Sequence, residues 1–486
     1  MVQFVDLDQE RESLEEERLL RPGVILFDAE AGTWRAFRPS SGFDEQGMGA
    51  PTRLEPGLWL SNMDFDRTRA LARPKGVTMR HDGWLRMKMD RIVAAWLGEN
   101  QPLERSVPLV ASFSDRVVRL IQEAVSPHLR RLGIQDPGEI RTQLSRASSL
   151  AGGIANLNAS AIRAGEGGDK RITDHFNRTY QWGMFIKGSK VDEEGHVRLT
   201  FSFPRLSYAL AITAGQVPTG QGWQLARRED NDSTQDFLNQ ILDTGRAPIF
   251  RASIRPGASA IPEYVDAFIS PLHSGEDGSR TRFIAAELQI LAEHYDIAVE
   301  SAICGESWGE SSTGLLLREL EVIAGGPRAA RASWSVALAA DNILSSAFRK
   351  PRSGQPADYA EPIWLAARDR AVMLPVIQAF YDAGATLVSA MQGTISVKCP
   401  SDPELLISVL DMAWEKGLTL ALDEVEMLTE MGVDVPAEEA RFGGNDVDYP
   451  LASLVHARKK RALYLLDSVQ THPRDAREKE YRKIMG

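Results

Sequence analysis

Apolar residues recur at helical spacing through much of this chain of 486 residues, and this recurrence limits its fold more than any other feature. Gly and Pro residues divide the pattern into short segments. The sequence therefore predicts an α-rich α+β fold, a large helical body with small β-hairpin or sheet elements and long Gly/Pro-rich loops. At this length we expect either one large body with subdomains or about three domains. The clearest helical pattern, at residues 84–97, consists of Leu85, Met89, Ile92, Val93 and Trp96.

Alternation of apolar and polar residues, the pattern of a half-buried strand, is clearest at residues 197–203. We expect this strand to form a hairpin with residues 182–187 across a polar turn at 188–195. The alternating apolar residues are Val197, Leu199, Phe201 and Phe203. Further strands are expected at residues 297–304, at residues 385–398, and as short strands within the loop-rich residues 24–75.

Capping residues and prolines mark several expected helix ends. Ser114 is expected to cap a helix that ends at Pro127, and Ser233 to cap the helix that follows a Gly-rich loop. Phe283 falls within another expected helix, and Ser401 is expected to cap a helix that ends before a glycine. The bounds of the main helices are therefore predicted from local signals alone.

Three regions are expected along the chain. Residues 1–22 form an acidic arm, because the first twenty residues carry seven acidic and two basic side chains. Residues 23–350 form the main α+β body. A basic loop at 349–354, which contains Pro351 and Gly354, separates this body from a mostly helical subdomain with a basic tail at 351–486.

Composition excludes several classes of protein. Hydrophobic residues make up 43% of the chain and charged residues 25%, values typical of a folded, water-soluble protein. No apolar run approaches the roughly 18 residues of a membrane span, and the acidic N-terminus is unlike a signal peptide, so we expect no membrane partner. Two distant cysteines, Cys304 and Cys399, favour a reducing, cytoplasmic location.

One short motif suggests nucleophilic catalysis. Gly305-Glu306-Ser307-Trp308-Gly309 matches G-x-S-x-G and lies between an expected strand and an expected helix. These five residues resemble the nucleophile elbow of α/β-hydrolases, and the resemblance implies a serine hydrolase with Ser307 as nucleophile. The upstream half lacks the alternating strands and helices of that fold, and His456 or His472 would have to supply the base.

Other motifs for small-molecule chemistry were sought in the sequence. The eight histidines form no H-E-x-x-H pair, the Gly-rich residues 165–170 lack the spacing of a phosphate-binding loop, and no G-x-G-x-x-G follows a strand. We therefore expect no catalytic, metal or cofactor residues.

Basic side chains gather at two places, and these are the expected points of phosphate contact. The net charge of −11 argues against a protein that coats nucleic acid, so such contact should be weak and salt-sensitive. The residues concerned are Arg349, Lys350, Arg352, Arg458, Lys459, Lys460 and Arg461.

Charged ends of opposite sign and the lack of a catalytic cluster favour a structural protein that assembles with itself. A shell around a double-stranded genome would present a weakly interacting interior. The main hypothesis is therefore a self-assembling viral capsid subunit, a homo-oligomer found in the virion, of a double-stranded RNA virus type. The alternatives are the serine hydrolase at Ser307 and a bacterial binding protein.

Overall fold

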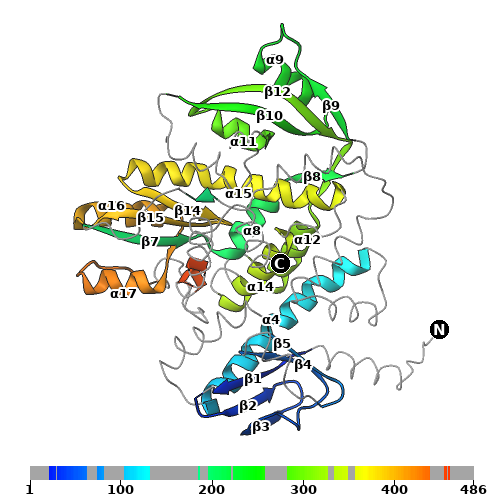
Figure 1. The fold of residues 1–486 in the computed structure, drawn as a ribbon, viewed down its shortest axis with the longest axis vertical. Helices are drawn as coiled ribbons and strands as arrows, with labels where there is room; N and C mark the ends of the chain where they lie inside the picture. Colours follow the sequence, from blue (N-terminus) through cyan, green and yellow to red (C-terminus); the bar gives the residue numbers. More distant parts are fainter. Residues whose placement is uncertain are drawn as a thin grey trace, which may run out of the picture.

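A computed structural model gives the fold, and it describes the chain in separate stretches. These are residues 21–28, 30–62, 74–81, 103–131, 184–185, 195–219, 223–257, 282–326, 333–348, 356–437, 454–456 and 458–459. The expected acidic arm, the predicted helix at 84–97 and most of the basic tail lie outside the described residues. The structure is mixed α+β, with several separate sheets (Figure 1). The region boundaries after residues 22 and 350 stay predictions.

The N-terminal sheet has the strand order β3-β2-β1-β4-β5. Its central strand β1 places Val24 against the helical core on one face and Ile25 against Trp59 and its neighbours on the other face. Strands β1, β2 and β3 are antiparallel, whereas β4 lies parallel to β1 and β5 parallel to β4. The strands are β1 (Gly23–Asp28), β2 (Thr33–Arg38), β3 (Phe43–Met48), β4 (Gly57–Ser61) and β5 (Val77–His81).

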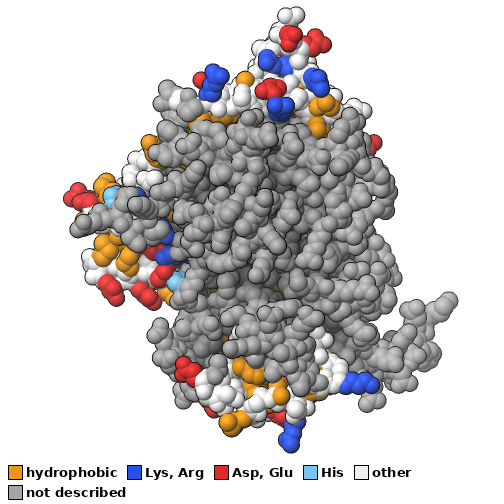
Figure 2. All heavy atoms as spheres, viewed as in Figure 1, with side chains coloured by type: hydrophobic (Ala, Val, Ile, Leu, Met, Phe, Trp, Pro, Cys, Tyr) orange, Lys and Arg blue, Asp and Glu red, His pale blue; other side chains and the backbone are white. Residues whose placement is uncertain are grey.

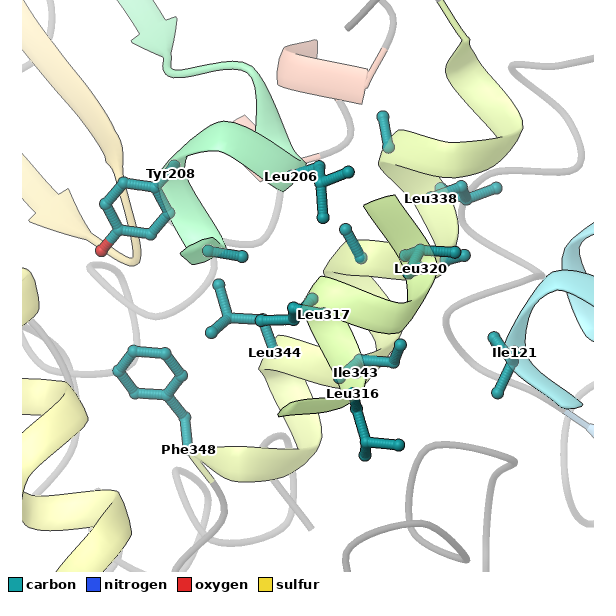
Figure 3. Close-up of a cluster of buried hydrophobic side chains, with 14 of the residues drawn as sticks. Ile121, Leu206, Tyr208, Leu316, Leu317, Leu320, Leu338, Ile343, Leu344 and Phe348 are labelled. Atoms are coloured by element: carbon teal, nitrogen blue, oxygen red, sulfur yellow. The ribbon is translucent and has the colours of Figure 1, made fainter. Parts of the chain in front are cut away.

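A group of helices packs against this sheet and forms the middle of the molecule (Figure 1). Apolar residues at helical spacing bury one face of α4, as the sequence pattern predicts. Figure 3 shows how leucines of α8, α12 and α14 meet in this core, with Tyr208 of α8 at its edge. The helices are α4 (Leu103–Arg131), α8 (Arg205–Thr213), α12 (Ser312–Ile323) and α14 (Trp334–Ala347).

A five-stranded sheet, here called the β7 sheet, has the order β16-β7-β15-β14-β6. Its strands come from distant parts of the chain, because β7 pairs with β15 and β6 pairs with β14. Helices α16 (Pro403–Glu415) and α17 (Leu422–Glu430) accompany it (Figure 1). The strands are β6 (Met184–Phe185), β7 (His196–Ser202), β14 (Thr386–Met391), β15 (Thr394–Pro400) and β16 (Thr419–Leu420).

Another antiparallel sheet, here called the β10 sheet, has the order β11-β10-β12-β9. It lies at the top of Figure 1, and Figure 2 shows acidic and basic side chains intermingled there. A two-stranded ribbon pairs β13 with β8. The elements are β8 (Gln216–Thr219), β9 (Gln224–Arg227), α9 (Thr234–Asp243), β10 (Ala247–Pro256), β11 (Arg282–Ile284), α11 (Ala285–Leu291), β12 (Tyr295–Gly305) and β13 (Ser307–Glu310).

The long helix α15 (Pro356–Asp382) joins the two hydrophobic cores of the protein. Residues of its first half, such as Trp364, pack into the core of α4, α12 and α14. Residues of its second half, such as Phe380, pack into the core between the β7 and β10 sheets. Between the two halves stand Arg368, Asp369 and Arg370, and the last two are 2% exposed. The charged triplet therefore lies where the two cores meet.

Several predicted elements are confirmed, among them β7, β12, α12 and the Ser233 cap of α9, whose hydroxyl accepts from the amide of Asp236. The predicted hairpin of residues 182–187 with 197–203 is wrong. The β14–β15 hairpin stands between β6 and β7, because β15 offers β7 a longer antiparallel partner than the two residues of β6.

Three local signals were also misread. Ser114 lies buried inside α4, which continues through Pro127, so it does not cap a helix. Phe283 lies in β11, because its side chain fills the core beneath the β10 sheet before α11 begins. Asp402, not Ser401, caps α16 by accepting from the amides of Glu404 and Leu405.

Candidate functional site

Buried polar side chains gather where α8, α14, α15 and the β14–β15 turn meet the helical residues 458–459. We call this group the arginine centre. Every member is at most 5% exposed. Its members are Arg205, Tyr208, Asp341, Asp369, Gln392 and Arg458.

The local sequence after β7 places Arg205 in this centre. Strand β7 ends at Ser202, whose hydroxyl lies 3.2 Å from the carbonyl oxygen of Gly393. Pro204 then stands as the N-cap of α8, with φ fixed at −53°, and Arg205 is the first helical residue. Because β7 pairs directly with β15, the start of α8 must lie beside the β14–β15 turn.

The two arginines converge on the same acceptors. Asp341 Oδ1 accepts from Arg205 Nε at 3.1 Å and from Arg458 Nη1 at 2.5 Å. The carbonyl oxygen of Gln392 accepts from Arg205 Nη1 at 2.6 Å and from Arg458 Nη2 at 2.9 Å. Arg458 Nε also donates to the Thr394 hydroxyl at 2.5 Å. Both guanidinium groups are thus fixed against the β14–β15 turn.

Asp369 of α15 holds this turn from the other side. Its carboxylate accepts from the backbone amides of Gln392, at 2.6 Å, and Gly393, at 2.9 Å, and from the Tyr208 hydroxyl. Both turn residues have positive φ, +48° at Gln392 and +68° at Gly393, as the central residues of a type I′ hairpin turn require. A side chain as large as glutamine adopts this conformation rarely, so the hydrogen bonds of Asp369 keep the turn in place.

Burial sets the protonation of these groups. It raises the pKa of the Asp369 carboxyl, although hydrogen bonds from Tyr208, Gln392 and Gly393 oppose the shift. Burial and the nearby Asp369 raise the pKa of Tyr208 well above its ordinary value, so the phenol keeps its proton and donates it in a hydrogen bond. Burial and the charge of Arg458 lower the pKa of Arg205 to about 10, and this guanidinium stays charged at neutral pH.

The hydrogen-bonding capacity of the centre is incompletely used. Arg205 Nη2 and both side-chain polar atoms of Gln392 have no hydrogen-bond partner among the described residues. Gln392 is fully buried and Arg205 is 2% exposed. A buried donor that lacks a partner costs about 1–3 kcal/mol, so these atoms favour any ligand that can pair with them.

The predicted nucleophile Ser307 has a different setting. It is an exposed residue at the start of β13, a strand that pairs antiparallel with β8, and Ser311 caps the helix that follows. A two-stranded ribbon therefore replaces the strand–turn–helix of an elbow. Gly305 permits close packing, since a Cβ there would lie 3.0 Å from the Trp223 ring.

The predicted phosphate contacts are placed unevenly. Arg458 is buried and paired with Asp341, and Lys459 is paired with Asp423 at 2.9 Å. Neither is the solvent-facing contact that the charge run predicts, because each is paired with a carboxylate of another helix. The remaining predicted contacts lie outside the described residues: Arg349, Lys350, Arg352, Lys460 and Arg461.

Two further observations bear on chemistry at the described residues. Within those stretches, no three His, Cys, Asp or Glu side chains are grouped closely enough to hold a metal ion, and no helix is long and apolar enough to cross a bilayer. Cys304 and Cys399 are buried thiols, and burial raises the pKa of Cys399 to about 12 and that of Cys304 to a lesser degree. Both are therefore poor nucleophiles.

Sequence comparisons find no matching family model and no matching curated protein. Solved structures of Phi29 DNA polymerase are similar in part. The complex with single-stranded DNA has a TM-score of 0.43 and 10% identity, covering 78% of this chain and 80% of that chain. The ternary complex with primer-template DNA and nucleotide has a TM-score of 0.41 and 10% identity, covering 77% and 80%.

These comparisons correct the functional predictions made from sequence. The similar structures belong to a DNA polymerase, so the predictions of a viral capsid subunit and of a serine hydrolase are wrong. The predicted homo-oligomer has no support from them. We carry neither activity nor ligand from the polymerase to this chain.

Proposed function

We propose that this protein binds nucleic acid by seating a backbone phosphate at the arginine centre. The observation that carries this proposal is that Arg205 Nη2 and the Gln392 amide, both in a buried site, have no hydrogen-bond partner in the part of the chain that the structure describes. Phosphate oxygens are acceptors that match an arginine fork and a carboxamide donor.

The charge balance of the centre favours an anion. Arg205 and Arg458 share one carboxylate oxygen, that of Asp341. The oxygens of Asp369 already accept from Tyr208 and the turn amides, and burial raises its pKa. The two guanidinium groups thus share one directly paired carboxylate, Asp341, and a phosphate would give them a second anionic acceptor.

The sequence around Arg458 favours a polymer over a single nucleotide. Arg458 is the first of four successive basic residues, Arg458 to Arg461. A strand that places one phosphate at the centre can offer neighbouring phosphates to the basic residues that follow Lys459 in the sequence, whereas a mononucleotide cannot. Contact with few phosphates, on a chain of net charge −11, should give weak and salt-sensitive binding.

Fluorescence anisotropy with labelled single-stranded and duplex DNA at two salt concentrations tests this proposal. We expect binding at low salt, and we expect Arg205→Met to weaken it at least tenfold and to reduce the salt slope by about one. Arg205→Lys keeps the charge, loses the fork and should give an intermediate affinity. Each variant's thermal unfolding confirms that it folds.

Arg251→Ala is the matched control. Arg251 is exposed on the β10 sheet and pairs with Glu300 at 3.1 Å, so its loss should leave the affinity unchanged. Unlabelled mononucleotide and inorganic phosphate serve as competitors. Absence of DNA binding at low salt would overturn the proposal, and so would equal affinities of Arg205→Met, Arg205→Lys and the unaltered protein. Competition by mononucleotide as strong as by DNA would refute the preference for a polymer.

A further inference from the structure

A second cluster of ionisable groups lies beside the arginine centre, and we call it the α17 junction. Two of its members, Asp423 and Glu424, stand in the first turn of α17. The other two, His456 and Lys459, belong to the helical residues 454–456 and 458–459. His456 Nδ1 lies 2.8 Å from Asp423 Oδ1, and Lys459 Nζ lies 2.9 Å from Asp423 Oδ2 and also contacts Glu424 Oε1.

The helical residues connect this junction to the arginine centre. His456 and Lys459 both contact Asp423 of α17, whereas Arg458, next to Lys459 in the sequence, contacts Asp341. These residues therefore meet both α17 and the β14–β15 turn. Any movement of these residues away from α17 therefore also moves Arg458.

We propose that the α17 junction is a proton-controlled latch, which holds His456 and Lys459 against α17, and with them Arg458 at the arginine centre, and releases them when Glu424 becomes charged. This inference rests on the proposed function, because it names the regulation of that same site. Glu424 is 1% exposed, and the one cation paired with it among the described residues, Lys459, is shared with Asp423. Its charge would therefore be poorly compensated in the closed arrangement.

The charges of the junction balance only while Glu424 is neutral. Lys459 and Asp423 cancel one another, so a charged Glu424 leaves one net negative charge in a buried place. Burial raises the pKa of Glu424 to about 8, Asp423 adds to the shift, and Lys459 opposes it. His456 and Lys459 help to hold the pKa of Asp423 below its ordinary range, so this carboxyl stays charged.

Other charged groups near the junction are few among the described residues. Strand β7 packs against α17 and carries Arg198, which is half-buried, and His196, which is exposed. Away from α17, Arg458 is held by Asp341. Glu424 is therefore the group whose ionisation changes the balance above neutral pH.

Hydrogen exchange of the ligand-free protein tests the latch. The reporters are the amides of Gln392 and Gly393, which the closed centre protects. Dividing the exchange rate of an unstructured chain at the same pH by the observed rate gives a protection factor. We expect this factor to fall at least tenfold between pH 7 and pH 9.5 in the unaltered protein and to stay constant in Glu424→Gln.

Matched variants separate the latch from general loosening. Glu426→Gln changes an exposed residue of the same helix and should behave as the unaltered protein. Lys459→Met removes the cation of the junction and should lower protection at both pH values. Constant protection from pH 7 to 9.5 in the unaltered protein would overturn the latch, as would an equal fall in Glu424→Gln. No DNA is present, so failure here is distinct from failure of the anisotropy test.

Discussion

A single carboxylate, that of Asp369, holds a turn that its sequence disfavours. Gln392 has φ of +48°, a conformation that costs most side chains about 1–2 kcal/mol. Asp369 accepts from the amides of Gln392 and Gly393 and so offsets part of this cost. The strain lies where the arginines converge, and strain of this kind often marks a functional site.

Replacing Gly393 by alanine should destabilise the protein by at least about 3 kcal/mol. The left-handed backbone costs alanine about 1–2 kcal/mol, and the new Cβ would lie 2.7 Å from the Tyr208 ring. Gly417→Ala is the control, because Gly417 has φ of +73° with nothing within 4 Å of an added Cβ. Urea unfolding measures both variants, and equal losses would show that the Tyr208 contact costs nothing.

Glu424 should make the free energy of unfolding fall as pH rises from about 4.5 to 8. Its pKa in the folded protein is about 8 and its ordinary value is 4.5, so within this window the folded chain holds a proton that the unfolded chain lacks. Glu424→Gln should lack this slope and gain stability relative to the unaltered protein as pH increases. Urea titrations at pH 5, 7 and 8.5 check this, and parallel curves would contradict it.

At the scale of elements, the charged triplet of α15, Arg368 to Arg370, forms hydrogen bonds with elements on both sides of the helix. Arg368 Nη1 donates to the carbonyl oxygen of Gly215 at 3.1 Å, just beyond the end of α8. Asp369 holds the β14–β15 turn. Arg370 Nε donates to Glu287 Oε1 of α11 at 2.7 Å, and both side chains are at most 2% exposed. The position of α15 is thereby fixed by polar contacts as well as by apolar packing.

Breaking the Arg370–Glu287 pair should be costly, whereas replacing both residues should not. Arg370→Met removes the cation paired with the buried Glu287 carboxylate and should cost about 3–5 kcal/mol. The double variant Arg370→Met with Glu287→Leu removes both charges and should recover most of the loss. A double-mutant cycle by urea unfolding measures the coupling. Additive losses would show that α11 and α15 are held by packing alone.

Local patterns predicted those elements whose signals lie within a few residues. Alternation at Leu199 and Phe201 indicated β7, and the Ser233 cap indicated α9. Pairing between distant strands carries no local signal, so the hairpin with residues 182–187 was misassigned. The break at Gln392-Gly393 was also missed, because Asn-Gly or Asp-Gly is the usual signature of such a turn.

Fewer residues of the arginine centre than elements of the fold could be predicted from the sequence. Arg458 was selected for its place in a basic run, yet it contacts Asp341 in the interior. Arg205 and Asp341 are single charges in otherwise apolar helical stretches, and Asp369 lies in a charged triplet within such a stretch; these are the signals that could have identified them. Which of these charges meet one another depends on tertiary contacts across more than a hundred residues, and no spacing rule contains that information.

At the scale of the whole molecule, the β7 sheet pairs strands that are far apart in the sequence, β7 with β15. Ser202 of β7 and Thr394 of β15 are 192 positions apart and share a hydrogen bond of 3.0 Å. The centre likewise needs residues from Arg205 to Arg458. A chain cut between these positions should lose both the sheet and the candidate site.

That separation has a consequence for synthesis on the ribosome. At about 5–20 residues per second, β7 leaves the ribosome roughly 10–40 s before β15 exists to pair with it. During this interval Leu199 and Phe201, both fully buried in the finished protein, have no strand beside them on the β15 side. Arrested chains that end at residue 384 should therefore be cleaved by protease within 196–202, whereas chains extended to residue 437 should resist. Nascent copies of this protein would then depend on chaperones for those seconds, and slow codons placed before β14 would lengthen that dependence.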